Sequence, residues 1–186
     1  MIDLSFPTVK LGQHIRKINT RVKDSNFDSS DIIVYGVTNI DGITVTGQKV
    51  SEDIGDYILL QKNQFAFNPY RINVGSLGLF QDDNIGAVSP AYVVFEALLS
   101  YDSDFLLFYL KSPLGIKLIK WYGDRGGVRA ALRFDDLCNI DVPDISVENQ
   151  RIFMQNFSVI KTNLNLSFML LIRVGILNKQ RFCLVF

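Results

Sequence analysis

The hydrophobic positions of this chain change their spacing along its length, and each spacing predicts a different element. Near the start, apolar residues recur at helical spacing, with Thr8 available as an N-cap. They are Val9, Leu11, Ile15, Ile18 and Val22. We therefore expect a first amphipathic helix here, whose outer face carries several basic side chains.

Shorter apolar runs bounded by turn residues predict strands. These runs cover residues 32–35, 43–46, 57–60 and 91–95. An Asp-Gly pair between the first two runs is a common hairpin signal. The last run follows a Ser-Pro pair and is typical of a buried strand.

The stretch between the last two of these runs has the most specific pattern of the sequence. Asn68-Pro69 marks a turn, because proline fixes its own φ and pushes the preceding residue towards extended conformations. Beyond this turn, Arg71, Asn73 and Ser76 alternate with apolar residues. Alternation predicts a strand that presents its polar side chains on one face.

Helical spacing returns in the second half of the chain. A helix is expected over 102–112, capped by Ser103 or Asp104, and another over 113–123, opened by a proline and closed by a glycine. Two extended pieces are expected next. They cover residues 128–134 and 139–143.

A long helix is predicted to follow Ser146, which can cap it, with Glu148 in the first turn. Four apolar residues on this helix are spaced four, three and four apart, as in a heptad repeat. They are Phe153, Phe157, Ile160 and Leu164. Such a stripe needs a partner surface, so these residues are candidates for helix pairing.

The order of elements predicts the α/β (α+β) class. We expect a globular mixed-sheet domain over 1–144, followed by a coiled-coil-type helical segment over 145–186. The end of this segment is unusually apolar and poor in acidic residues. No internal repeat or long linker interrupts the chain.

Composition narrows the compartment and the kind of partner. Hydrophobic residues make up 48% of the chain, but no uncharged apolar run is long enough to span a membrane. Cys138 and Cys183 lack metal or redox spacing, which favours reduced thiols in a cytoplasmic protein. The net charge is zero, yet basic residues gather over 10–23, over 111–133 and after 148. Segregated charge of this kind either builds a positive surface or belongs to ordinary solvated faces.

Catalytic signals are weak. His14 is the single histidine, and no nucleophile elbow, metal-ligand cluster or Walker motif is present. Asn68-Pro69-Tyr70 resembles the Asn-Pro-Pro-Tyr motif of amino-methyltransferases, but it is one proline short and lacks an upstream glycine-rich segment. We therefore expect a chain without catalysis, metal or cofactor of its own.

Nucleic-acid contact is better supported by the residue types. Arginine pairs with guanine and asparagine with adenine in the major groove, while lysine meets phosphate. Trp121 lies beside two lysines but is expected in the core. The candidate DNA-binding residues are Lys62, Tyr70, Arg71, Asn73, Ser76, Lys117, Lys120, Arg125 and Arg129.

Three segments carry a resemblance to a known family. They are YILLQKNQFAFNPYRINVGSLG (57–78), GAVSPAYVVFE (86–96) followed by FLLFYLKS, and VRAALRFDDLCNIDVPDISVENQRI (128–152). Their order and spacing resemble the specificity subunit of type I restriction-modification systems. The resemblance covers roughly residues 9–165 and implies one target recognition domain followed by one spacer helix.

The resemblance also implies partners. In this family the domain binds one half of a split target in double-stranded DNA, and separate methyltransferase subunits bring S-adenosylmethionine and modify adenine. A restriction subunit completes the complex. Family members carry two recognition domains, so a chain with one implies a half-length form that pairs with a second copy or a second specificity chain. Alternatives are a truncated or phase-variable remnant that serves as a recombination donor, and a protein-interaction module without DNA binding.

Overall fold

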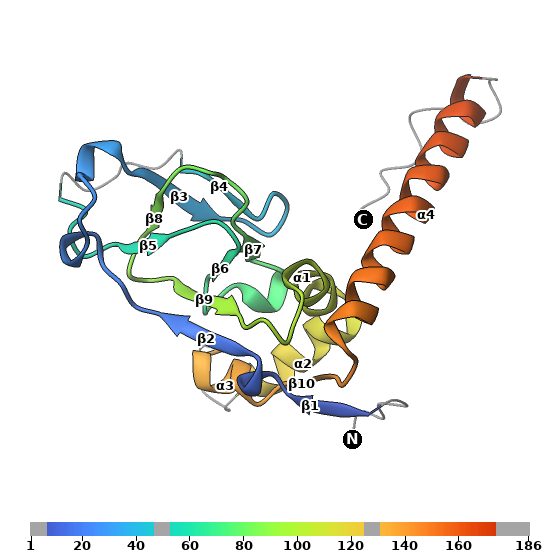
Figure 1. Ribbon diagram of the computed structural model, residues 1–186, viewed down its shortest axis with the longest axis horizontal. Helices are drawn as coiled ribbons and strands as arrows, with labels where there is room; N and C mark the ends of the chain where they lie inside the picture. The colour runs from blue at the N-terminus through green and yellow to red at the C-terminus, as the bar shows by residue number, and fades with distance from the viewer. Residues whose placement is uncertain (1–6, 47–52, 125–130, 174–186) are drawn as a thin grey trace.

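A computed structural model of the chain describes residues 7–46, 53–124 and 131–173, and it describes side chains up to residue 163 (Figure 1). The predicted α+β class is confirmed. Two four-stranded sheets, a two-stranded ribbon and a group of helices make up these parts of the chain. One long helix, α4 (Val147–Arg173), projects away from the other elements in Figure 1.

The first sheet lies in the middle of the domain. Its strand order is β2-β9-β6-β7 and its neighbours are antiparallel. These strands are β2 (Ile15–Ile18), β6 (Gln64–Phe67), β7 (Leu77–Leu79) and β9 (Val93–Ala97). Phe65, Phe67 and Phe95 are fully buried on one face, and the rings of Phe65 and Phe95 stack with centroids 4.6 Å apart.

The two faces of this sheet meet different partners, as strand alternation requires. The three phenylalanines pack with helices α1 (Ser103–Lys111) and α2 (Pro113–Gly123) in the main core. Ala66 and Val94 point the other way and pack with residues of the second sheet. The sheet is therefore buried on both faces.

The second sheet is mixed, with strand order β4-β3-β8-β5. Its strands are β3 (Ile33–Val37), β4 (Ile43–Val45), β5 (Ile58–Leu60) and β8 (Gly86–Val88). The predicted hairpin between β3 and β4 is confirmed, and Gly42 adopts a φ of +69° in its turn. A Cβ at Gly78 of β7 would lie 2.7 Å from the backbone nitrogen of Ile43, so β7 runs directly against this hairpin.

The predicted first helix is wrong. The segment instead forms β1 (Thr8–Lys10), the 3-10 turn η1 (Leu11–Gln13), β2 and the 3-10 turn η2 (Val22–Asp24), before η3 (Ser29–Asp31). β1 pairs with β10 (Asp141–Pro143), and β2 pairs with β9. Several of the apolar residues are β-branched and pack well in strands, and these distant pairings decide the outcome.

Two further predicted strands differ in the structure. Residues 71–76 form a turn around η4 (Ile72–Val74), closed by Gly75 with a φ of +93°. The predicted strand over 128–134 lies partly outside the described residues, and its end begins helix α3 (Phe134–Cys138). There the carboxylate of Asp136 accepts a hydrogen bond from Arg133 N (3.0 Å), which favours a helix start.

The other predicted elements of the second half are confirmed. α2 begins and ends where its proline and glycine predict, and Ser146 Oγ accepts from Asn149 N (3.3 Å) in the first turn of α4. The cap of α1 is Asp102 rather than Ser103 or Asp104, because its carboxylate accepts from Phe105 N (3.0 Å).

Helix α4 is fastened to the domain at its base. The Gln150 side chain is fully buried, accepts from Asp102 N (2.8 Å) and donates to Ile145 O (2.9 Å). Phe153 packs against the α1 residues Phe105 and Phe108, at centroid distances of 5.6 and 5.4 Å. Within the parts of the chain described here, no helix is long and apolar enough to cross a membrane.

Candidate nucleic-acid interface

The turn around η4 is held by its own backbone. Asn68 O accepts from Arg71 N (3.0 Å) and Ile72 N (2.9 Å), and Asn68 Oδ1 accepts from Tyr70 N (3.0 Å). Ile72 is 1% exposed and anchors the turn in the core. Anchored in this way, the turn leaves Tyr70 and Arg71 exposed and Asn73 half-buried.

Ser76 does not belong to this exposed set. It is buried, and its hydroxyl donates to Val37 O (2.9 Å), so it joins the turn to β3. Its prediction as a DNA-binding residue is corrected, because no surface remains for a ligand. Lys62 is exposed, but its ammonium pairs with Asp83 (2.6 Å).

Helix α2 presents a basic outer face. Ser112 Oγ caps it by accepting from Gly115 N (3.0 Å). Its inner face buries Leu118 and Ile119. Three exposed residues lie on the outer face at i, i+3 and i+4. They are Lys117, Lys120 and Trp121.

The expectation that Trp121 lies in the core is wrong, since its side chain is 70% exposed. Positions three and four apart share a helix face. Trp121 therefore lies on the same face as Lys117, whereas Leu118 and Ile119 lie on the face that packs against the core.

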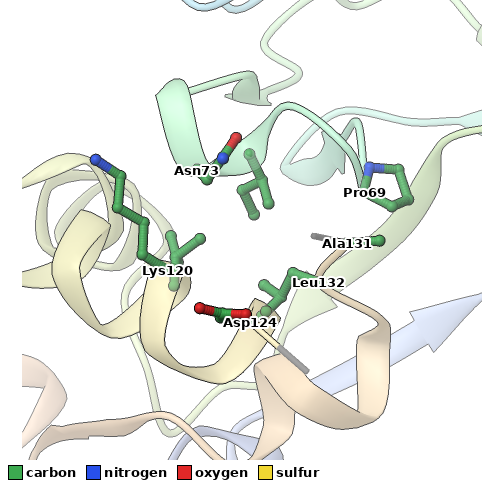
Figure 2. A pocket seen from close by; sticks show the side chains of 9 residues that line it. Pro69, Asn73, Lys120, Asp124, Ala131 and Leu132 are labelled. Atoms are coloured by element: carbon green, nitrogen blue, oxygen red, sulfur yellow. The ribbon is translucent and has the colours of Figure 1, made fainter. Parts of the chain in front are cut away.

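The η4 turn and α2 lie side by side around a cavity of about 290 Å³ (Figure 2). Ile72, Ile119 and Leu132 give it an apolar lining, and Leu132 N donates to Pro69 O (3.0 Å) at its side. In Figure 2, Asn73 lies across the cavity from Asp124. Its remaining lining residues are Lys120, Gly123 and Ala131.

The η4–α2 surface (Tyr70, Arg71, Asn73, Lys117, Lys120 and Trp121) carries three basic side chains, and Asp124 lies in the lining of its cavity. Arg71, Lys117 and Lys120 make no ion pair with another described residue, whereas six other basic side chains do. Those pairs are Lys10–Asp141, Arg16–Glu96, Arg21–Asp56, Lys23–Asp56, Lys62–Asp83 and Arg151–Asp102. The hydrogen bond and charge of Lys23 lower the pKa of Asp56, as expected of such a pair. The structure thus brings together five predicted residues, with a positive charge open to an anionic ligand.

The remaining predicted residues stand as follows. Arg125 and Arg129 lie outside the described residues, between α2 and Ala131. His14 is used structurally: its Nδ1 lies 2.9 Å from Ser100 Oγ, and its ring packs against Tyr101. The described ranges contain no cluster of side chains that could hold a metal ion.

The predicted pairing stripe of α4 is partly occupied within the chain. Phe153 and Phe157 pack against Phe108 of α1, with centroid distances of 5.4 and 4.8 Å. Ile160 is 56% exposed and makes no such contact. The side chain of Leu164 lies outside the described residues.

Comparisons with known proteins place this arrangement among solved folds. No family model matches the chain, and no curated protein matches it. A chain from a structure on complex assembly and conformational transition of the type I R-M system matches with a TM-score of 0.60 and 17% identity, covering 90% of this chain and 46% of that one. The HsdS subunit from Thermoanaerobacter tengcongensis matches with a TM-score of 0.53 and 17% identity, covering 88% and 40%.

The chain thus spans less than half the length of each solved chain that it matches. At 17% identity these matches establish the fold and leave individual residues untested. They agree with the resemblance carried by the three sequence segments. The chain has the fold of the specificity (HsdS) subunits of type I restriction-modification systems.

Proposed function

We propose that this chain is a non-catalytic DNA-recognition subunit of a type I restriction-modification complex, and that it binds one half of a split target through the η4–α2 surface. The observation that carries the proposal is the grouping of Arg71, Lys117 and Lys120 on one surface, where none of them makes an ion pair with a described acidic residue. DNA is the polyanion that such a surface suits. The specificity-subunit fold supports the choice.

The residue types divide the work of binding. Lys117 and Lys120 are placed to meet phosphates, which fixes the orientation of the protein without reading sequence. Arg71 and Asn73, on the turn beside them, have the side chains that pair with guanine and adenine edges. The anchored backbone of this turn limits how far they move, and that rigidity favours discrimination between bases.

The complex around the chain completes the activity. Methyltransferase subunits would supply S-adenosylmethionine and modify adenine, and a restriction subunit would cleave, so this chain needs no cofactor of its own. The complex would act on cytoplasmic DNA. Helix α4 would pair through Ile160 and the exposed edges of Phe153 and Phe157 with a second copy or a second specificity chain. A two-fold pair would then read a palindromic split target.

Replacing Arg71 tests the base-reading role. A duplex selected from a random library by binding to the full chain serves as the specific site, and a scrambled duplex serves as the reference. Arg71→Ala should weaken specific binding by about 1–3 kcal/mol and spare binding to the scrambled duplex. Lys23→Ala is the matched control, because Lys23 lies on η2 and pairs with Asp56, and the segment that forms η2 is far from α2 in Figure 1. Equal losses on both duplexes would make Arg71 a phosphate contact, and selection of no sequence would refute recognition by this chain.

A further inference from the structure

Trp121 is the one tryptophan of the sequence, and its side chain is exposed on helix α2 instead of packing in the core. A tryptophan side chain carries a large apolar surface that proteins usually bury. Here 70% of the residue is exposed, and no aromatic ring of the described residues stacks on it. Exposed tryptophans beside charged residues are typical of binding surfaces.

The helix fixes the position of Trp121 within the η4–α2 surface. Successive residues turn by about 100°, so Lys117 and Trp121 lie about 40° apart and Lys120 lies on the opposite side of Lys117. Lys120 lines the cavity beside η4, and Trp121 does not. The two lysines therefore lie between the indole and the turn that carries Arg71 and Asn73.

This order of groups indicates the chemistry of the ligand. Two ammonium groups within one helical turn suit a ligand with neighbouring anionic groups. The indole beside them suits an apolar or aromatic surface on the same ligand, next to those anionic groups. Duplex DNA offers both, because phosphates flank the sugar carbons, the base edges and the thymine methyl group. An apolar partner protein would leave the charges of Lys117 and Lys120 without a complement.

We infer that Trp121 is a DNA-contacting residue, whose indole packs on sugar and base edges next to the phosphates held by Lys117 and Lys120. The inference rests on the proposed function and adds a contact that does not depend on charge. Burying an indole edge should contribute about tenfold in affinity. Because no counter-ion is released by this contact, the contribution should be the same at every salt concentration.

The chain carries its own probe for this contact. Tryptophan emission of the full chain is recorded during titration with a mixed-sequence duplex, while the anisotropy of a labelled duplex reports binding independently. We expect the emission to change and to saturate with the anisotropy. Trp121→Ala should weaken binding about tenfold with an unchanged salt slope, whereas Lys117→Ala should lower that slope by about one. Phe27→Ala is the matched control, since Phe27 is 46% exposed and the segment between η2 and η3 that contains it is far from α2 in Figure 1.

The outcomes separate the inference from the function on which it rests. Binding by anisotropy with unchanged emission and an unaffected Trp121→Ala variant overturns the inference alone. Emission that changes only when a methyltransferase subunit is added makes Trp121 a protein contact and also overturns it. Absence of any duplex binding by the wild-type chain overturns the proposed function together with the inference. Urea unfolding of each variant separates loss of contact from loss of fold.

Discussion

Gln150 fixes the direction in which α4 leaves the domain, so its replacement should destabilise the fold. Its side chain is fully buried and holds Asp102 N and Ile145 O with bonds of 2.8 and 2.9 Å. Gln150→Ala leaves both backbone groups without this partner, and each such loss costs about 1–3 kcal/mol. Ile145 is 39% exposed, so water can replace part of that bond.

We therefore expect Gln150→Ala to lower the free energy of unfolding by about 2–3 kcal/mol, near the lower end of the range for two lost bonds. With a urea m-value of about 2 kcal/mol/M, the unfolding midpoint should fall by about 1 M. Asn149→Ala is the matched control, because this neighbouring side-chain amide is exposed. It should change stability by less than about 0.5 kcal/mol. Equal midpoints for the two variants would refute the role of Gln150 in holding α4 to α1.

Two further predictions concern the packing around α1. Gly115→Ala should lower the free energy of unfolding by about 1–3 kcal/mol or more, because the new Cβ would lie 2.2 Å from Tyr109 O. Gly123→Ala is the control, since the atom nearest to its new Cβ is 3.5 Å away. Equal urea midpoints for the two variants would contradict this prediction. Tyr109 donates to Asp141 O, and burial raises its pKa from 10.0 to about 12. The unfolded chain releases this proton at lower pH than the folded chain, so the free energy of unfolding should fall as pH rises from about 10 to about 12. Urea titrations across this pH range should show a smaller fall in the free energy of unfolding for Tyr109→Phe than for the wild-type chain. An identical fall would show that Tyr109 does not cause this pH dependence.

Local chemistry was enough to predict several elements before the structure. Helix α2 begins at Pro113 and ends at Gly123, and the Asp-Gly pair forms the β3–β4 turn. These residues restrict the backbone conformation within a few positions, so their effect can be predicted from the local sequence. The first helix could not be excluded in this way. Ile15 pairs with Ala97, more than eighty positions away, and only that pairing makes the segment a strand.

The candidate site was predicted in part. Arg71, Asn73 and the two lysines of α2 come together on one surface, although the turn was expected to be a strand. The exposure of Trp121 was missed. Its four-residue spacing from Lys117 places both residues on one face of the predicted helix, and this spacing could have indicated that Trp121 is exposed. Gln150 carries no such signal, since nothing in the sequence distinguishes this buried amide from its exposed neighbour Asn149.

Methylation directed by the chain tests the central claim most directly. The full chain is co-expressed with the methyltransferase subunit of its system, the mass of the complex is determined, and methylated adenines in the host DNA are mapped. We expect a complex and adenine methylation confined to one sequence pattern, which Arg71→Ala loses or relaxes while the complex still forms. A methyltransferase subunit that binds no copy of this chain, or a methylation pattern that is the same with and without it, would contradict a role in DNA recognition.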